Sequence, residues 1–390
     1  MGFEFLKFNC LGLGRRANKR KQIHNSNSST GSATGNNGNG NGNDDHIMVE
    51  DQHYSSSPIR KFSWDEIKRF TMNFSSSRVI GSGGFSTVYL ADLTSSSMTT
   101  STSKTHHHHH QIASVKMSNG SRSVFKQELD ILRHLHHRNI VNLIGYCDDQ
   151  EDEVSGGALV LEYVSNGSLQ EKLHGKRHGT NDNKTLIPWR KRMAIAAQLG
   201  EALEYLHDKC GTSLPVVHGD IKASNVLLDH NLNVKLCDFG SAKMGFSSTV
   251  VLSRNTRPRV LMGSPGYTDP HYLRTGIPSK KNDVYSFGVI LLELVTGLEP
   301  FSSERPTQLL TSLLGPMLLD DAADDDHARV VDPRLGRDFD QEEAKVLLAL
   351  SAECLRHPPT LRPSAAQILE TINNHVSIHE DDKEKKPSHH

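Results

Sequence analysis

Alternating apolar and polar positions predict a block of β-strands in the first half of the chain. Runs of strand length lie at residues 78–91, 112–117, 140–147 and 158–163. A glycine-rich turn divides the first of these runs, which therefore predicts two strands. Two further short strands joined by a turn are expected at 226–228 and 234–236.

Helical spacing dominates the chain after residue 167. Apolar positions three and four residues apart predict helices at 189–207, 283–296, 342–355 and 364–378. Two more helices are expected among the strands, at 64–70 and 123–135. Ser63 is placed to cap the first of these two, with Glu66 at the capping-box position. Strands followed by helices predict an α+β fold with two lobes, a small β-rich N-lobe and a larger helical C-lobe.

Low-complexity segments flank and interrupt this pattern. From about residue 25 to residue 45 the chain is so rich in Asn, Gly and Ser that it cannot offset its ordering entropy by burying apolar surface. We therefore place one domain at 62–378, with its core at 74–376. A disordered segment, 1–61, is expected before it and a charged flexible tail, 379–390, after it. The Ser- and Thr-rich residues 94–111 are expected to form a mobile insert within the domain.

Composition excludes several classes of protein. The formal net charge is −1, so overall charge does not predict a nucleic-acid partner. The five cysteines are scattered and form no C-x-x-C pair, which argues against a disulfide framework or zinc ribbon and fits a reducing compartment. No apolar run reaches the ~18–20 residues of a membrane span. The five consecutive histidines at 106–110 are interpreted as incidental low complexity rather than a metal site.

The N-terminus carries features of a lipid anchor. Gly2 stands where N-myristoylation requires it, although the motif's Ser or Thr at position six is Leu6 here. Cys10 is a candidate for acylation, and the basic cluster at 15–21 would attract an anionic membrane surface. Because this cluster follows the apolar start, a secretory signal peptide is not expected. A cytoplasmic location is expected, and two interpretations stay open: peripheral attachment at the plasma membrane, or a flexible solvated tail.

A glycine-rich turn between two predicted strands has the composition of a phosphate-binding loop. Glycines let backbone N–H groups approach phosphate oxygens without interference from Cβ atoms. A strand rather than a helix follows the turn, which argues against a dinucleotide-binding motif. The candidate nucleotide-binding residues are Ile80, Gly81, Ser82, Gly83, Gly84, Phe85, Ser86, Thr87 and Val88.

The octet His218–Asn225 combines the side chains that phosphoryl transfer needs. Asp220 offers a carboxylate for a hydroxyl proton, Lys222 a cation for the γ-phosphate, and Asn225 an oxygen ligand for Mg²⁺. Asp238, in an Asp-Phe-Gly sequence that follows a predicted strand, supplies a second metal ligand. Either motif alone is compatible with a solvated polar loop, but both in this order predict a phosphotransferase site.

With these motifs, the sequence from about Phe74 to Val376 resembles the eukaryotic protein kinase family. It is similar in particular to plant receptor-like and receptor-like cytoplasmic kinases. The phrases that carry this closer resemblance are F-S-W-D-E-I at 62–67, G-G-F at 83–85, H-R-N-I-V at 137–141, L-I-G-Y-C at 143–147, N-G-S-L at 166–169 and G-S-P-G-Y at 263–267.

The resemblance implies a role for each matching residue. Lys116, in the phrase A-S-V-K, would hold the α- and β-phosphates of ATP, and Glu128 would pair with Lys116 from a helix. Asp220 would be the catalytic base and Lys222 would steady the γ-phosphate. The remaining implied roles are Mg²⁺ binding by Asn225 and Asp238, adenine binding at the hinge Leu161, Glu162 and Tyr163 with Leu161 as gatekeeper, and support of the catalytic loop by Asp283.

Three positions depart from the family pattern. Ser86 replaces the third glycine of the phosphate loop. Gly219 replaces the arginine that in many members pairs with a phosphorylated activation segment, so the chain resembles the non-RD type. His271 replaces a glutamate that normally pairs with an arginine matched here by Arg362. His271 cannot form that ion pair, and whether another acid replaces it stays open.

The activation segment, 238–270, contains several hydroxyl side chains near arginines. Its candidate phosphorylation residues are Ser247, Ser248, Thr249, Ser253, Thr256 and Ser264. A phosphate beside Arg254, Arg257 or Arg259 would order the segment through charge-assisted hydrogen bonds. The alternative is a mobile basic loop that is never phosphorylated.

These features together predict an ATP- and Mg²⁺-dependent Ser/Thr protein kinase that acts in signalling downstream of a receptor. Lys222, two residues after the base, resembles the Ser/Thr pattern. The expected partners are protein substrates and ATP; a membrane receptor kinase and an anionic membrane surface are open additions, and nucleic acid is not expected. The alternative function is a pseudokinase scaffold that binds partners with little or no phosphoryl transfer.

Overall fold

The computed structural model describes residues 58–83, 86–96, 111–118, 122–149, 156–175, 186–211, 214–245, 263–318 and 327–376. The candidate lipid anchor, the histidine run, Gly84, Phe85 and the charged tail lie outside the described residues. The candidate phosphorylation residues at 247–256 and the neighbouring arginines also lie outside them. Among the described residues, no helix is long and apolar enough to span a membrane.

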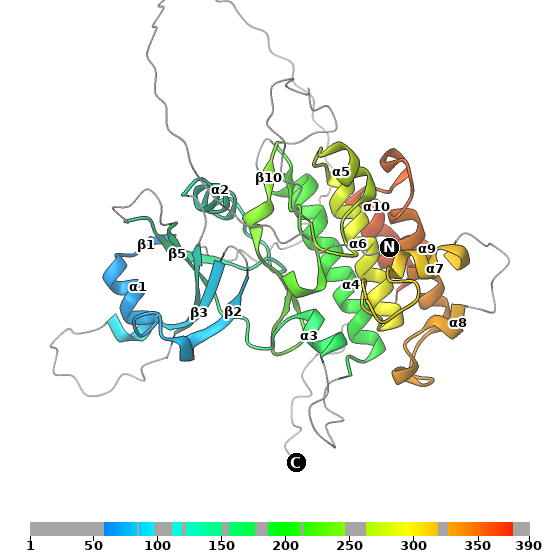
Figure 1. The fold of residues 1–390 in the computed structure, drawn as a ribbon, viewed down its shortest axis with the longest axis horizontal. Coiled ribbons are helices and arrows are strands. Elements are labelled where there is room, and N and C mark those ends of the chain that lie inside the picture. The colour runs from blue at the N-terminus through cyan, green and yellow to red at the C-terminus, as the bar shows by residue number, and fades with distance from the viewer. Residues whose placement is uncertain are drawn as a thin grey trace, which may run out of the picture. The chain divides into compact units, whose positions relative to one another are not determined.

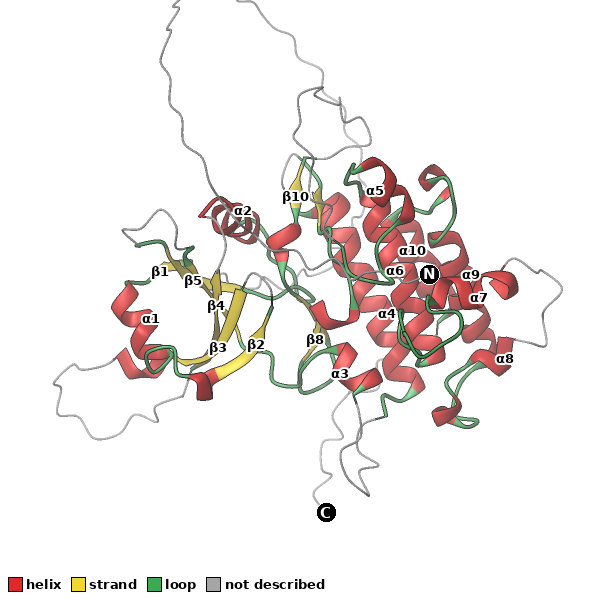
Figure 2. Ribbon diagram, in the orientation of Figure 1, coloured by secondary structure: helices red, strands yellow, loops and turns green. Residues whose placement is uncertain are grey.

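Six strands form one sheet in the N-terminal lobe (Figures 1 and 2). Their order across the sheet is β1-β5-β6-β4-β3-β2. All neighbours pair antiparallel except β1 and β5, which are parallel. The strands are β1 (Arg60–Lys61), β2 (Val79–Ser82), β3 (Ser86–Asp92), β4 (Ile112–Ser118), β5 (Leu143–Cys147) and β6 (Ala158–Glu162). The expected strands are present, but the strand expected from residue 140 is wrong at its start, because β5 begins at Leu143.

The folded part of the chain begins earlier than the expected boundary at residue 62. β1 adds a strand at the edge of the sheet, and the helix α1 (Trp64–Phe70) follows it. The predicted capping box is confirmed: the Ser63 side chain accepts from the Glu66 N–H, and the Glu66 carboxylate accepts from the Ser63 N–H. Phe62, Ile67 and Phe70 are buried in an apolar cluster with residues of β4, β5 and β6. Residues 62–70, which precede the expected core, thus cover one face of the sheet.

Helices make up most of the C-terminal lobe, as helical spacing predicts (Figure 2). They are α3 (Leu169–His174), α4 (Trp189–Glu204), α5 (Pro270–Thr275), α6 (Lys280–Thr296), α7 (Leu310–Leu318), α8 (His327–Val330), α9 (Gln341–Cys354) and α10 (Ala365–His375). In the N-terminal lobe, α2 (Arg122–Leu132) carries Glu128. The expected helix at 364–378 is wrong at its end, because α10 stops at His375 and Val376 is extended. The α+β fold with a β-rich N-lobe and a helical C-lobe is confirmed.

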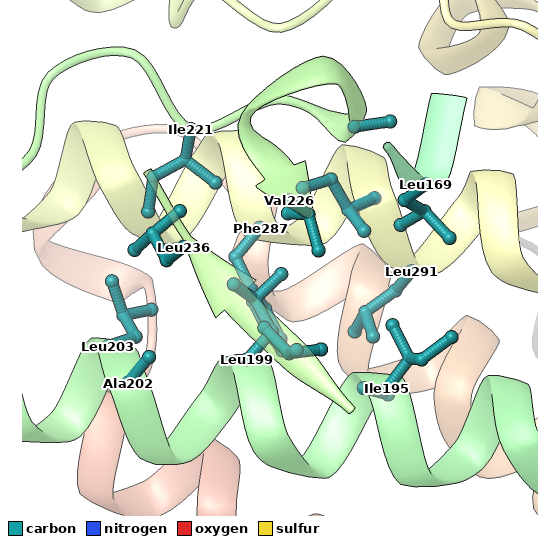
Figure 3. Packing of buried hydrophobic residues seen from close by; sticks show 14 of the residues in the cluster. Leu169, Ile195, Leu199, Ala202, Leu203, Ile221, Val226, Leu236, Phe287 and Leu291 are labelled. Carbon is teal, nitrogen blue, oxygen red and sulfur yellow. The ribbon is translucent and has the colours of Figure 1, made fainter. Parts of the chain in front are cut away.

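Two pairs of short strands flank the catalytic segment. β7 (Val216–Val217) pairs with β10 (Lys243–Met244), and β8 (Val226–Leu228) pairs with β9 (Val234–Leu236). The main apolar core of the lobe lies beneath these strands. Figure 3 shows side chains of α4 and α6 packed around them; the labelled members include Ile195, Leu199, Leu203, Val226, Leu236, Phe287 and Leu291. The polar catalytic loop therefore packs against this apolar core.

Candidate active site

The catalytic loop is fixed from below by one apolar and one acidic side chain. Ile221 points into the core beside Leu236 (Figure 3) and is almost fully buried. Asp283, at the start of α6, accepts hydrogen bonds from the backbone N–H groups of His218 and Gly219, each at 2.8 Å. The other neighbour of Asp283 is the His207 ring, whose Nε2 lies 3.0 Å from Oδ2. Asp283 and the catalytic loop are thus brought together as the resemblance implies.

The glycine at 219 has a backbone reason. Its φ is +78°, in the left-handed region that side chains other than glycine adopt only at a cost. A Cβ atom here would lie 3.0 Å from the carbonyl oxygen of Ser241. Glycine rather than arginine at position 219 therefore suits both the positive φ and the close approach of the Ser241 backbone.

Asp220 lies at the centre of a cluster of polar side chains. The Lys222 Nζ atom donates to Oδ2 of Asp220 at 2.6 Å. The Asn225 amide donates to the backbone oxygen of Asp220 at 2.8 Å and to its carboxylate at 3.2 Å. Lys222 and Asn225, both singled out in the octet, therefore each contact Asp220.

Ser264 is a member of this cluster that the sequence analysis did not assign to the site. Its hydroxyl donates to Oδ1 of Asp220 at 2.8 Å and accepts from Lys222 Nζ at 3.0 Å. A small hollow opens here, with Asp220, Ser264 and Thr268 among its lining residues. The structure thus shows that Ser264, first considered only as a phosphorylation residue, contacts both charged residues of the loop.

Lys116 joins the sheet to the catalytic segment. Its ammonium on β4 lies 2.6 Å from the carboxylate of Glu128 on α2 and 2.7 Å from that of Asp238. Burial opposes the charged form of Lys116, but the two carboxylates outweigh it and raise the pKa of Lys116 above its usual value. Burial alone would raise the pKa of Asp238, but the Lys116 ammonium holds that pKa below its usual range. Both groups are therefore charged at neutral pH.

Asp238 and Asn225 are held next to each other by backbone contacts. The N–H of Cys237 donates to the Asn225 carbonyl at 2.9 Å, which places the residue before Asp238 against Asn225. The Asn225 amide nitrogen donates to Asp220, so the atom of this side chain that can bind a cation is the amide oxygen. A carboxylate and an amide oxygen are the hard ligands that Mg²⁺ prefers. Burial raises the pKa of the Cys237 thiol to about 12, so this neighbour is an uncharged thiol at neutral pH.

The phosphate loop is a turn between β2 and β3. Gly81 opposes Val88 and Ser82 opposes Thr87 in the ladder, and the Gly83 N–H donates to the Ser86 carbonyl at 2.9 Å. Val88 in turn opposes Lys116 on β4, so the loop and the lysine belong to neighbouring strands. The expectation of a strand, a glycine-rich turn and a strand is confirmed for the described residues.

The hinge residues, 161–163, lie at the C-terminal end of β6. Leu161 is buried, whereas Tyr163 is exposed. The Glu162 carboxylate is 2.9 Å from Lys235 Nζ and accepts from the Asn142 N–H at 2.7 Å. What Glu162 offers a ligand in this arrangement is its backbone rather than its side chain.

The ion pair that His271 cannot make is made by a neighbour. Asp269, two residues earlier, forms a buried double ion pair with Arg362. The question that the sequence left open is therefore answered: a second acid does replace the missing glutamate.

Comparisons with known proteins agree with this geometry. The family model of the protein kinase domain matches residues 74–372. The chain is 48% identical over 323 residues to a probable receptor-like protein kinase of Arabidopsis thaliana, covering 80% of this chain and 86% of that protein. It is 44% identical over 331 residues to the salt tolerance receptor-like cytoplasmic kinase 1 of Oryza sativa subsp. japonica, covering 84% of this chain and 83% of that protein.

Proposed function

We propose that this chain, which belongs to the protein kinase family, transfers the γ-phosphoryl group of ATP to serine and threonine hydroxyls of proteins. The observation that carries the proposal is the contact of Asp220 with Lys222 and Ser264, at 2.6 and 2.8 Å. A carboxylate, an ammonium and a hydroxyl at one point form a place where an acceptor hydroxyl can meet a phosphate. Family membership supplies the coarser statement, a protein kinase that uses ATP and a divalent metal.

Asp220 and Lys222 have complementary roles in the proposed reaction. The Asp220 carboxylate accepts the proton of the attacking hydroxyl and orients its oxygen toward the phosphorus. Lys222 places a positive charge where the transferred group develops negative charge. Ser264 bonds to both, so it holds the two charged groups in register and occupies a wall of the acceptor hollow.

The N-terminal lobe supports the other half of the proposal, the binding of the nucleotide. Lys116, fixed by Glu128, provides the cation for the α- and β-phosphates, and the turn between β2 and β3 covers the phosphates. Asp238 and Asn225 would hold Mg²⁺, which when bound would neutralise charge on the phosphate oxygens. The role of Asp283 is to keep the loop's backbone in place, since it accepts two backbone N–H groups there.

A pseudokinase scaffold is the weaker alternative. Its support came from Ser86, Gly219 and His271. Gly219 fits its backbone conformation, and Asp269 takes over the ion pair that His271 lacks. The ion pair of Lys116 with Glu128, which phosphoryl transfer in this family requires, is in place, and Asp238 lies beside Lys116.

The proposed setting is signalling on the cytoplasmic side of a membrane receptor. It is supported by the similarity to receptor-like kinases. Attachment at the plasma membrane through the N-terminus belongs to the same proposal. Fractionation of wild type beside a Gly2→Ala, Cys10→Ser variant tests it; a wholly soluble wild type would exclude the anchor.

The acceptor class is tested by incubating the full chain with labelled ATP, Mg²⁺ and a generic protein substrate. Hydrolysis of the labelled product and separation of its phosphoamino acids should give phosphoserine and phosphothreonine. Phosphotyrosine as the main product would contradict the Ser/Thr assignment. Absence of transfer, with ADP still bound, would favour the scaffold.

A further inference from the structure

Gln127 on α2 makes two hydrogen bonds that the proposed reaction does not use. Its side-chain Nε2 donates to the backbone carbonyl of Ala242 at 2.5 Å, and its Oε1 accepts from Lys243 Nζ at 3.0 Å. A side-chain amide has one donating and one accepting end, so a single orientation of Gln127 makes both bonds. Half-buried beside Glu128, Gln127 therefore contacts two successive residues of the segment that follows Asp238.

These two bonds connect the lobes across 115 and 116 residues of sequence. Lys243 begins β10 and lies opposite Val217 of β7, which directly precedes His218 of the catalytic loop. Ala242 is fully buried, so bulk water does not reach its carbonyl oxygen when the donor from Gln127 is removed. The bonds of Gln127 thus join α2 to a strand pair that leads into the catalytic loop.

The same bonds fix how α2 is rotated about its axis. Successive residues of an α-helix point ~100° apart, so Gln127 and Glu128 face different neighbours. Glu128 lies 2.6 Å from Lys116 and accepts from the Phe239 N–H. Because a rotation of α2 moves both side chains together, the bonds of Gln127 resist any rotation that would carry Glu128 away from Lys116.

Gly219 makes this connection matter more in this chain. Ser241, the residue before Ala242, passes so close to Gly219 that a Cβ atom there would lie 3.0 Å from the Ser241 carbonyl oxygen. A glycine has no side chain with which to hold the passing segment to the catalytic loop. The bonds from Gln127 hold that segment from the N-terminal lobe instead.

We propose that Gln127 is a positioning residue for the phosphate transfer, and that it acts by holding Glu128 against Lys116. The inference rests on the proposed function, because Lys116 is the residue assigned there to the α- and β-phosphates of ATP. A small displacement of a positioned charge lowers the rate even when the charge itself is kept. The rate therefore depends on a side chain that touches neither the nucleotide nor the acceptor.

A double-mutant cycle on the full chain tests this route of action. Gln127→Met keeps the length of the side chain and the helix propensity but can make neither bond. It should lower kcat/KM for ATP about five- to thirtyfold, the effect of one or two lost hydrogen bonds. In a Glu128→Gln background the same substitution should change kcat/KM less than twofold, because the pair through which Gln127 acts is already weakened. Effects that multiply in full would overturn the proposal.

Hydrogen–deuterium exchange without nucleotide gives a second readout that does not depend on activity. Gln127→Met should speed exchange of the backbone amides of α2, about five- to thirtyfold, and leave those of α4 as in wild type. Unchanged exchange in α2 would overturn the proposal, and faster exchange throughout the chain would show general destabilisation instead.

Lys126→Met is the matched control, because it places the same new side chain at an exposed neighbouring position of α2. It should leave kcat/KM and exchange as in wild type, and a loss equal to that of Gln127→Met would overturn the role of Gln127. A wild type that transfers no phosphate would overturn the proposed function. The exchange comparison would then still decide whether Gln127 holds α2 in place.

Discussion

Asp269 and Arg362 form a buried double ion pair across 93 residues of sequence, with N–O distances of 2.6 and 3.0 Å. The Asp269 carboxylate also accepts from the His271 N–H and from the Asn282 side chain. The pair thereby ties the end of the activation segment to the residues before α10. It lies directly after the segment that carries Ser264, so it also supports the acceptor side of the site.

Removing the acid should destabilise the C-terminal lobe. Asp269→Asn leaves the buried Arg362 charge without its carboxylate, which typically costs about 3–5 kcal/mol. His271→Ala is the control. It removes the side chain at the position that differs from the family pattern, and it keeps the backbone N–H that donates to Asp269. Urea unfolding should show a large loss for the first variant and a small one for the second. Equal losses would mean that His271 carries the stability.

The same pair should make stability depend on acidity. Burial would raise the pKa of Asp269, but its bonds to Arg362 and neighbouring N–H groups outweigh this and lower it below the usual value. A lowered folded-state pKa gives a contribution that is complete above about pH 5 and lost as the pH falls through the folded-state pKa. The difference in unfolding free energy between wild type and Asp269→Asn should therefore be constant from pH 5 to 8 and shrink below about pH 4. A difference that grows on acidification would contradict the sign.

Gly219 should be required for its shape. Gly219→Ala forces a side chain into φ +78° and against the Ser241 carbonyl. Gly211→Ala shares the positive φ, +70°, but its Cβ meets nothing within 4 Å. Each should lose about 1–2 kcal/mol of stability from the backbone. Only Gly219→Ala should also lower kcat, by about tenfold or more, because the shift displaces Asp220; equal activity in the two variants would refute this.

Ser264 should matter for turnover. Ser264→Ala removes a hydrogen bond to each of two charged groups, and one such bond is worth about 1.5–3 kcal/mol, so kcat should fall by at least about tenfold. Ser264→Thr keeps the hydroxyl and should retain most of the rate. The assay is steady-state phosphate transfer with melting temperatures measured in parallel. If alanine and threonine give the same rate, the hydroxyl has no role in the reaction.

Much of the fold was predictable because long elements carry strong periodic signals. The helices at 189–207 and 283–296 contain several turns of apolar residues, and both exist close to their expected bounds. The α4 helix ends at Glu204, and the chain continues to Lys209 as a π-helical turn, Tyr205–Lys209. Two-residue strands such as β1 and one-turn helices such as α8 have too few residues for any period to appear.

The candidate site was predictable where a residue lies within a recognisable motif. Lys116, Asp220 and Asp238 are each in such a motif, and the fold brings Lys116 to Asp238 across 122 residues. Ser264 lies in the phrase G-S-P-G-Y, but that phrase did not indicate its contact with Asp220, which spans 44 residues and depends on how the activation segment returns to the loop. The sequence contains only a weak indication of the role of Asp269, which is an acidic residue two positions before His271. Only the packing of the fold shows that Asp269 is the acid that pairs with Arg362.

The measurement that bears most directly on the proposed activity compares wild type with Asp220→Asn in phosphate transfer from Mg²⁺-ATP. Loss of the base should lower kcat by ~10²–10⁴-fold. Affinity for ADP and the melting temperature should stay close to wild type, since Asn keeps the shape of the side chain. Asp208→Asn, at an exposed pair with Lys280 on the same lobe, is the matched control and should keep full activity. Equal transfer by wild type and Asp220→Asn would contradict the assignment of this loop as the catalytic centre.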